Sequence, residues 1–366
     1  MANILVLGVK VPFTWGGQDV LVATLIKELK ARGHLADVVE LPFQVPPKEN
    51  LLLQSALWRA LDLTSFGGRD VDLVIATKYP SFYARHPRKS LWLVHQHRPI
   101  YDLLAGQYSD FSDNPRDEAM RRMIFTGDTK VIGECRYISG ISKNVCERLK
   151  AYNGLDAEVL YPPLPLGRRY RSGPAQDYIL SVGRICGIKR VDMLIKALPI
   201  VHQSIKLKIV GTPDEPDIMD YLQNEIAKHH LGERVEFLGR VSEQELIELY
   251  AGALAVYYAP HNEDFGYVTL EALASGKAVV TAADSGGVLE FVKDGQTGLV
   301  VEPNIDAIGH AFRELAEDRD RAAKLGADGR AFIEQSGFLD GGWDQVIGGL
   351  LSPLTASDKL NAVNAR

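Results

Sequence analysis

Short apolar runs alternate with amphipathic segments along the first half of the chain. The runs are long enough for buried strands and too short for most helices; they lie at 3–8, 35–41, 72–77, 91–95 and 137–141. Between the first two runs, apolar residues recur at helical spacing from Asp19 to Arg32, and Gly33 follows in the position of a helix C-terminal glycine. A strand, helix and strand of this size predict a parallel crossover unit. The stretches near 44–70 and 98–130 show no clear period, so we expect helices and loops there without assigned bounds.

The second half repeats this alternation after a break. Proline, glycine and arginine without periodicity at Tyr161–Gln176 predict a linker. Strands are then expected at 178–182, 206–210, 235–238, 254–259 and 278–281, and helices at 191–201, 217–230, 243–251 and 270–275. Strands that alternate with helices favour a parallel sheet covered on both faces. The predicted fold class is therefore α/β with two such units, followed by a frayed polar tail at 356–366.

Charge is distributed unevenly along the 366 residues. The formal net charge is −6, with an excess of basic residues in 1–173 and of acidic residues in 174–366. Two interpretations of the basic half stay open: a scatter of solvated side chains, or contact with a phosphorylated acceptor or an anionic membrane surface. Its basic clusters have no aromatic interleaving, so we expect no nucleic-acid partner; they consist of Lys78, Arg85, Arg88 and Lys89, and of Arg116, Arg121 and Arg122.

The cysteines and the hydropathy pattern bear on the compartment. Three cysteines without a CxxC pair fit a reducing compartment and argue against a disulfide framework. The apolar start of the chain predicts a strand rather than a signal peptide, and no apolar run reaches the roughly 18 residues of a membrane span. We therefore expect a cytoplasmic protein, with peripheral contact at the inner face of the membrane as the open alternative.

Two acids in 259–300 form the first candidate site. Glu263 and Glu271 are separated by seven residues, and Phe265–Val268 lies between them. Gly266 permits close approach of a ligand to the backbone, and the amides that open the following helix suit phosphate or sugar oxygens. Glu271 is placed to reach a diol such as ribose. The competing interpretation is a helix-capping acid followed by a surface acid.

Two cations form the second candidate site. Arg184 and Lys189 follow the strand at 178–182 directly, separated by four residues, and Gly183 precedes them. The forked guanidinium and the mobile ammonium suit a diphosphate held from two sides. A pair of solvated cations beside a loop glycine is the alternative.

The first half has two further candidates at strand ends. Gly16 and Gly17 follow the first strand, where open α/β sheets bind ligands. His95 ends the strand at 91–95, either as a catalytic or binding group or as a histidine bonded within the sheet edge. Asp70 and Asp72 form a DxD, which some sugar-transferring enzymes use for a metal. Two acids alone leave most of a Mg²⁺ or Mn²⁺ shell unfilled, so we favour a strand-start role and expect no metal site.

The order of these motifs resembles that of the retaining family 4 glycosyltransferases. The motifs are GR-x4-K, IVG, EFLG, P-x2-E-x7-E, GG-x2-E and DGxTG, and the resemblance is strong over 178–303, moderate at the glycine pair and weak at 42–130. It implies a GT-B fold, in which two Rossmann-like domains face each other across a cleft. The implied domains are an acceptor domain at 1–165, a nucleotide-sugar domain at 177–335, a helix at 336–352 that crosses back onto the first domain, and a tail at 353–366.

The resemblance also implies a role for each candidate residue. Arg184 and Lys189 would hold the donor diphosphate, Glu263 would contact the donor sugar, and Glu271 would bind the ribose. His95 would touch the transferred sugar. The remaining donor-binding positions would be Gly16, Gly17, Gly183, Gly211, Arg240, Val241, Phe265, Gly266, Tyr267 and Val268, with Arg240 and Val241 lining the base.

Family members need no metal or other cofactor. The implied reaction moves a hexose from a nucleotide-diphosphate sugar to a hydroxyl acceptor, such as a polysaccharide or glycolipid precursor, with retention of configuration. The alternatives are a GT-B sugar-nucleotide epimerase and a catalytically silent GT-B scaffold. The chain departs from the family pattern at three positions: Arg190 stands in place of a glycine, Asp19 in place of a glutamate, and Leu289 in place of a proline. Arg190 is expected either to add a third cation or only to alter the helix start.

Overall fold

The computed structural model describes residues 1–14, 16–104, 106–339 and 341–355. The chain divides into two compact units, one formed by Met1–Pro162 with the chain from Gly342 onward, and one formed by Pro163–Gly341. The expected linker at Tyr161–Gln176 is not a free segment, because Tyr170 is 2% exposed and packs edge-on against Tyr250 within the second unit. Of the expected tail, 356–366 lies outside the described residues.

Unit 1 is built on a parallel sheet. Its strands are β1 (Asn3–Lys10), β2 (Leu35–Pro42), β5 (Leu73–Ala76), β6 (Lys89–Leu93), β7 (Tyr137–Gly140) and β8 (Glu158–Val159). They lie in the order β2-β1-β5-β6-β7-β8, and all neighbours are parallel. The crossover unit expected from the first two runs is thus present, because β1 pairs with β2 and α1 (Gly17–Ala31) connects them.

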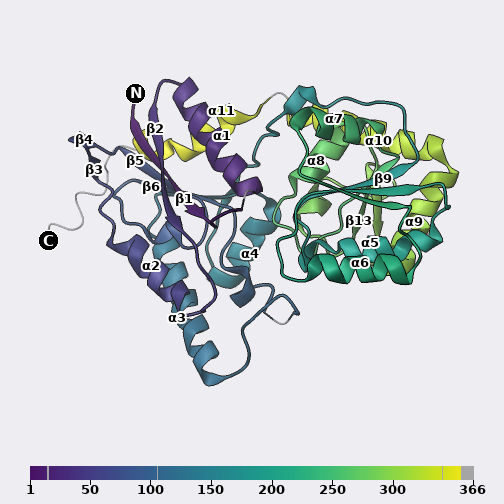
Figure 1. Ribbon diagram of the computed structural model, residues 1–366. Helices are drawn as coiled ribbons and strands as arrows, with labels where there is room; N and C mark the ends of the chain where they lie inside the picture. The colour runs from purple at the N-terminus through teal and green to yellow at the C-terminus, as the bar shows by residue number, and fades with distance from the viewer. Residues whose placement is uncertain (15, 105, 340, 356–366) are drawn as a thin grey trace. The chain divides into compact units, whose positions relative to one another are not determined.

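Helices cover both faces of this sheet. They are α1, α2 (Asn50–Ala60), α3 (Pro115–Ile132), α4 (Lys143–Asn153), α11 (Trp343–Leu350) and α12 (Ser352–Thr355). Figure 1 shows α1 and α11 on the face opposite α2 and α3, and an ion pair between Arg32 and Asp344 joins α1 to α11. Trp343 of α11 packs edge-on against Trp92 of β6 at 6.0 Å. Residues 353–355, expected in the tail, belong to α12.

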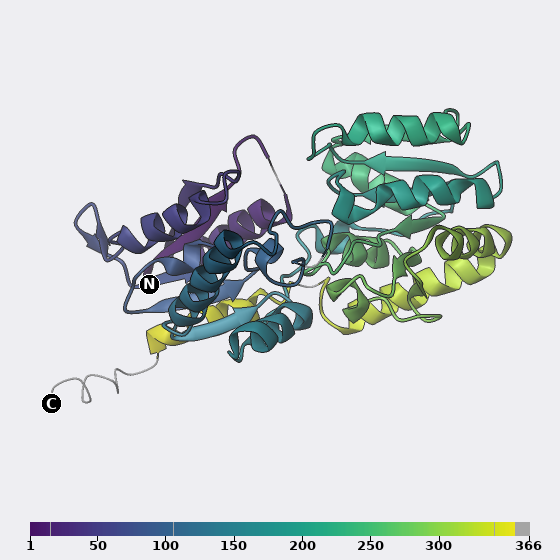
Figure 2. The ribbon, with the colours of Figure 1, turned by 90° about the horizontal axis from the view of Figure 1, so that it is seen from below.

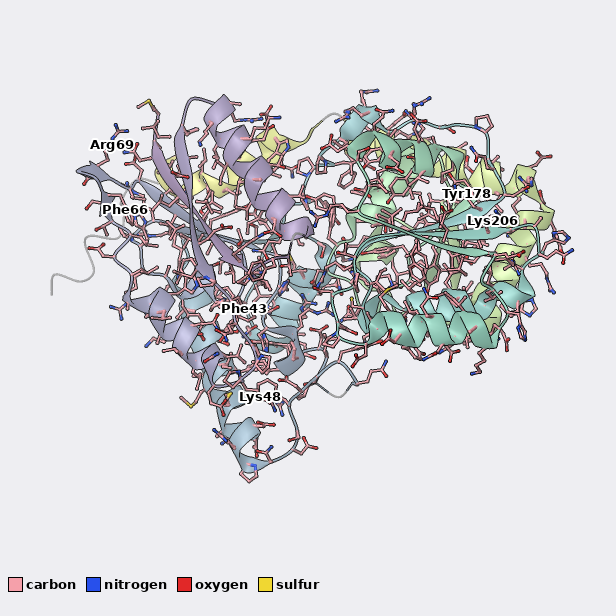
Figure 3. The ribbon with its side chains drawn as sticks, viewed as in Figure 1. Phe43, Lys48, Phe66, Arg69, Tyr178 and Lys206 are labelled. Carbon is pink, nitrogen blue, oxygen red and sulfur yellow. The ribbon has the colours of Figure 1, made fainter. Side chains whose placement is uncertain are left out.

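The two stretches without assigned bounds contain regular elements. The first holds α2 and an antiparallel hairpin of β3 (Ser65–Phe66) and β4 (Arg69–Asp70), in which Phe66 pairs with Arg69, both labelled in Figure 3. The second holds the short η2 turn (Arg98–Ile100) and α3. The two strands of the hairpin have two residues each, which is too short to show a hydrophobic period, so the sequence does not place them.

Polar groups are buried beneath α3. The Asp128 carboxylate accepts hydrogen bonds of 2.7 Å from the hydroxyls of Tyr83, in η1 (Ser81–Tyr83), and of Tyr101. Burial raises the pKa of Asp128 to about 7, against the lowering effect of the two hydroxyls. The buried Lys89 ammonium donates to three backbone carbonyls, including that of Phe82 at 2.8 Å. These groups tie α3 to the sheet by specific hydrogen bonds as well as by apolar contact.

Unit 2 contains a second parallel sheet. Its strands are β9 (Tyr178–Val182), β10 (Lys206–Val210), β11 (Val235–Gly239), β12 (Ala255–Tyr257), β13 (Val279–Ala282) and β14 (Gly298–Val301), in the order β11-β10-β9-β12-β13-β14. Tyr178 and Lys206, labelled in Figure 3, are register partners at the amino ends of β9 and β10. The carboxyl ends of both strands therefore lie together at the opposite end of the sheet, where Gly183 follows β9 and Gly211 follows β10.

Helices also cover both faces of the second sheet. They are α5 (Val191–Ala197), α6 (Ile218–Lys228), α7 (Glu243–Gly252), α8 (Tyr267–Ala274), α9 (Ile305–Glu317) and α10 (Arg319–Gln335). Figure 1 shows α5, α6 and α9 on one face and α7, α8 and α10 on the other, and Figure 2 shows the consecutive α9 and α10 in yellow-green and yellow. The helix expected at 191–201 ends its α-helical part at Ala197, because Pro199 lies in a 3₁₀ turn, η5 (Leu198–Ile200).

Candidate functional site

A pocket opens at the carboxyl edge of the second sheet. It is lined by residues from β9, β10 and β12 and from the turn after β9: Ser181, Val182, Gly183, Arg184, Lys189, Val191, Ile209, Tyr257 and Tyr258. Three predicted site residues, Gly183, Arg184 and Lys189, are therefore brought together at one place. This is the position where open α/β sheets bind ligands.

Two glycines allow the strand exits at this end of the sheet to pack closely. Gly183 and Gly211 have φ angles of 139° and 144°, which side chains other than hydrogen rarely permit. A Cβ on Gly211 would lie 1.8 Å from the carbonyl oxygen of Gly183, so the two strand exits approach too closely for any side chain there. The Gly183 N–H donates to Val210 O at 2.9 Å, and the Gly211 N–H donates to Gly239 O at 2.8 Å. The three strand exits are thus joined in a row.

Lys189 lies at the end of the short turn η4 (Gly187–Lys189) and is paired with one of the predicted acids. Its ammonium donates to the Glu263 carboxylate and, at 3.2 Å, to the Tyr258 hydroxyl. Burial by itself lowers the pKa of Lys189, but the adjacent carboxylate and hydroxyl outweigh burial and raise it. The Lys189 and Glu263 side chains are only 14% and 18% exposed. A fixed positive charge therefore faces the pocket at any physiological pH.

Arg184, which also lines the pocket, is held by a different carboxylate. Its guanidinium donates to the Asp214 carboxylate, on the loop that follows β10, and half of the Arg184 side chain is exposed. The next residue of that loop, Glu215, accepts a hydrogen bond of 3.0 Å from the Gly187 N–H. Both predicted cations are thus paired with carboxylates from elsewhere in the same unit.

Arg190 is explained by the backbone. It has a φ of 54° and ψ of 36°, the left-handed conformation that glycine adopts most easily. Its guanidinium makes a bidentate contact with Asp284 at 2.7 and 2.6 Å and a contact of 2.9 Å with His261. Two expectations were open for Arg190: an additional cation for the diphosphate, or an altered helix start. The structure favours the altered helix start, because the bidentate ion pair with Asp284 offsets the energetic cost of the left-handed conformation at the start of α5.

Glu271 lies on α8 among tyrosines. Its carboxylate accepts a hydrogen bond of 2.7 Å from the Tyr250 hydroxyl. Burial raises the pKa of Glu271, while hydrogen bonds from Tyr250 and Tyr170 act in the opposite direction. These tyrosines orient the Glu271 carboxylate by hydrogen bonds. Glu271 is therefore not the solvated surface acid of the alternative interpretation.

The loop between Glu263 and Glu271 is shorter than predicted, because the helix that follows it starts earlier. The predicted helix at 270–275 begins three residues earlier, because Gly266, with a φ of 82°, precedes the first residue of α8, Tyr267. A Cβ on Gly266 would lie 2.8 Å from the Tyr258 ring. Phe265 is buried and packs edge-on against Tyr267 and Phe291. Tyr267 and Val268 therefore occupy the first turn of α8, where helix N–H groups have no partner within the helix.

The other predicted positions of unit 2 lie next to these. Arg240 and Val241 follow β11, the edge strand beside β10, and the Arg240 side chain is exposed.

The remaining predicted residues belong to unit 1. Gly16 precedes α1, and its N–H donates to the Asp19 carboxylate at 2.8 Å, which also pairs with Lys10 at 2.7 Å. A Cβ on Gly16 would have no neighbour within 4 Å, and its φ of −147° is ordinary, so the described neighbours do not require a glycine at 16. Gly17 is the first residue of α1.

His95 was expected to end a strand, and this prediction is wrong. β6 runs from Lys89 to Leu93, two residues earlier at each end than predicted. The earlier start follows from Lys89, whose buried side chain the sequence pattern does not count as a core position. His95 lies in the loop beyond the strand, with Nδ1 at 2.7 Å from Gln96 O.

Comparisons with known proteins give this arrangement a family. Residues 168–332 match the family model "Glycosyl transferases group 1". The chain carries a group 1 glycosyltransferase domain. D-inositol 3-phosphate glycosyltransferase from Nocardia farcinica is 29% identical over 292 residues, which are 73% of this chain and 62% of that protein. Glycogen synthase from Mycobacterium tuberculosis is 36% identical over 182 residues, 47% of this chain and 42% of that protein. The matches thus span about half of these curated relatives' own length.

Solved structures confirm the predicted GT-B fold. HepE from Anabaena, in complex with UDP and glucose, has a TM-score of 0.72 at 18% identity, covering 96% of this chain and 100% of HepE. Sucrose-phosphate synthase from Thermosynechococcus elongatus has a TM-score of 0.76 at 17% identity, covering 96% and 99%. At these identities the likeness concerns the fold, which is two Rossmann-like parallel sheets.

The glycosyltransferase domain also contains site residues that the sequence analysis missed. Tyr258, Tyr250 and Asp214 contact predicted site residues, and Asp284 contacts Arg190. None of the four belongs to a motif. The sequence signal was position: Tyr258 lies near the end of the strand predicted at 254–259, and Asp214 lies in the loop that follows the strand predicted at 206–210. Their roles depend on which strands are neighbours, which periodicity does not specify.

Two further expectations concern metal and membrane. The Asp72 carboxylate accepts a hydrogen bond of 2.8 Å from the Asn3 N–H, as a strand-start residue would. Asp70 lies in the β3–β4 hairpin. Within the described part of the chain, no group of three or more His, Cys, Asp or Glu side chains is arranged to hold a metal ion, and no helix is both long and apolar enough to cross a bilayer.

Proposed function

We propose that this chain is a retaining, metal-independent glycosyltransferase of family 4 that moves a hexose from a nucleotide-diphosphate sugar to a hydroxyl of a polysaccharide or glycolipid precursor. The observation that carries the proposal is the convergence of Gly183, Arg184 and Lys189 on one pocket, with the Gly211 strand exit packed against Gly183. A diphosphate is the common group of nucleotide-sugar donors, and two cations at the end of a parallel strand match it in charge and position.

The cations would act on the leaving group. As the glycosidic bond breaks, negative charge grows on the phosphate oxygen that leaves with the nucleotide. Lys189, whose pKa is raised by its partners, and Arg184 would stabilise this charge without a metal ion. The departing phosphate oxygen would then accept the acceptor's proton, and the acceptor oxygen would attack from the same face, which retains the configuration.

The acids and the helix start would orient the donor. Glu271, held by Tyr250, would accept hydrogen bonds from the ribose hydroxyls. Glu263 would contact the donor sugar as a positioning residue, and the amides at Phe265–Val268 would bind sugar and phosphate oxygens. Arg240 and Val241 would line the base. His95, Gly16 and Gly17 of unit 1 keep the predicted roles at the transferred sugar and the phosphates.

The test begins with nucleotide binding. Thermal unfolding in the presence of chelator, with UDP, GDP, ADP or CMP added, should show one nucleotide that raises the unfolding temperature; at about 100 times the dissociation constant the stabilisation is roughly 2.7 kcal/mol. UDP is the first choice because the HepE structure contains it. The matching sugar donor with a panel of hydroxyl acceptors should then give a linked product whose anomeric configuration equals that of the donor.

Other results would assign the site differently. Conversion of the donor to an epimer without acceptor would identify an epimerase. Nucleotide binding without turnover on any acceptor would favour the scaffold. An inverted product would refute the retaining mechanism, and a failure of all four nucleotides and of the intact donors to bind would refute the donor site.

A further inference from the structure

The loop that follows β10 places two carboxylates on hydrogen-bond donors of the segment Gly183–Lys189. Residues 211–217, with the sequence GTPDEPD, contain three acids and no basic residue. Asp214 accepts from the Arg184 guanidinium, and Glu215 accepts from the Gly187 N–H at 3.0 Å. Arg184 lines the pocket, and Gly187 lies between Arg184 and Lys189 in the same turn. Two separate carboxylates of one loop thus contact two hydrogen-bond donors of the segment that carries both predicted cations.

This loop is attached to the turn by its backbone. The Ile185 N–H donates to Thr212 O at 2.9 Å, and the Asp214 N–H donates to Ile185 O at 3.1 Å. Ile185 and Pro213 also form an isolated parallel bridge. The main chain of 212–214 is therefore held beside the pocket, whereas the Asp214 side chain can leave Arg184 by rotation about its own bonds.

We propose that Asp214 and Glu215 are counter-ion residues of the donor site, whose carboxylates occupy the phosphate-binding groups until the donor diphosphate displaces them. The proposal rests on the proposed function and adds two affinity-determining residues to it. Each ion pair that must be broken subtracts from the donor's binding free energy. The same carboxylates would return to Arg184 and Gly187 when the nucleoside diphosphate leaves, so tight product binding is avoided at the cost of weaker donor binding.

Neutral amides at these positions test the proposal. Asp214→Asn and Glu215→Gln keep the size of the side chains and remove the competing charge. Each variant should bind UDP and inorganic pyrophosphate about three- to tenfold more tightly than the wild type, since an exposed ion pair and a charge-assisted hydrogen bond are of that order. Asp220→Asn is the control: Asp220 is exposed in the first turn of α6, and its neutralisation changes the net charge equally but should alter affinity less than twofold.

Calorimetric titration of the full chain with each probe gives the outcome. If the wild type binds and Asp214→Asn binds equally or more weakly, the carboxylate supports Arg184 instead of competing with the ligand, and the inference fails while the proposed donor site stands. If all three variants tighten binding equally, only net charge matters, and the inference also fails. If neither the wild type nor Asp214→Asn binds pyrophosphate, any of the four nucleotides or an intact donor, the donor site itself is wrong.

Discussion

Replacing Lys189 by alanine removes the cation that Glu263 and Tyr258 share at the edge of the pocket. Two effects follow from the structure. The Glu263 carboxylate, 18% exposed, loses its ion-pair partner, and the proposed diphosphate loses one of its two cations. The two effects separate experimentally, because the first concerns stability and the second concerns ligand affinity.

The magnitudes come from burial and charge. Breaking a fully buried ion pair on one side costs about 3–5 kcal/mol, and partial exposure of both side chains here reduces this to roughly 1–3 kcal/mol. For the ligand, a charge-assisted contact of the ammonium with a diphosphate oxygen contributes about 1.5–3 kcal/mol, which is a 10- to 150-fold change in dissociation constant. Loss of the ion pair should lower the unfolding temperature of unit 2 by roughly 2–12 °C, at about 2–4 °C per kcal/mol for a domain of this size.

A second substitution distinguishes binding from packing. In Lys189→Ala with Glu263→Gln, the orphaned carboxylate is neutral, so the unfolding temperature should largely recover. The nucleotide affinity, measured by calorimetric titration with the nucleotide that stabilises the wild type most, should stay low. Lys228→Ala, which removes an equally charged side chain that is 67% exposed on α6, should change neither quantity.

The reasoning would be refuted by either of two results. One is a folded Lys189→Ala variant with the affinity and turnover of the wild type. The other is recovery of affinity together with stability in the double variant, which would show that Lys189 acts only by satisfying Glu263.

Three more perturbations test other parts of the structure. Gly211→Ala places a Cβ against the neighbouring backbone and should destabilise unit 2 by at least about 1–3 kcal/mol in thermal unfolding, whereas Gly232→Ala, with open space around it, should be nearly neutral; equal effects would contradict the close strand exits. Asp128 has a raised pKa of about 7, so stability that is fully present near pH 4 should fall as pH rises through 7, and Asp128→Asn should flatten this dependence; an unchanged pH profile of the unfolding temperature would show that Asp128 does not control it. Excess chelator should leave sugar transfer unchanged, and a large loss restored by Mg²⁺ or Mn²⁺ would revive Asp70 and Asp72 as metal ligands.

Much of the fold was predictable because strands and helices bury apolar surface with different periods. The strands at 178–182 and 206–210 match β9 and β10 residue for residue, since the first is largely apolar, the second alternates lysine with apolar residues, and each ends at a glycine. Predictions were less accurate where a polar residue is buried. Lys89 extends β6 at its start because its ammonium finds three carbonyls, which no local pattern reveals.

In the candidate site, too, the sequence predicted local relations between residues but not the long-range contacts. The sequence specified that Arg184 and Lys189 follow one strand and that Glu263 and Glu271 flank a helix start, because these relations are local. It did not specify that Lys189 contacts Glu263, 74 positions away, or that Arg184 contacts Asp214, 30 positions away.

By itself, therefore, the sequence determined the order of the strands and helices, the glycines at the strand exits and the motifs of the glycosyltransferase domain, all of which depend on neighbouring residues. Only the tertiary structure decided which charges meet. The sheet order β10-β9-β12 places β12 beside β9 although two strands separate them in the chain, so the loops after β9, β10 and β12 lie at the same end of the sheet, and there each cation acquires its carboxylate partner. The physical reason is that hydrophobic periodicity specifies which face of an element is buried but not which element lies beside it.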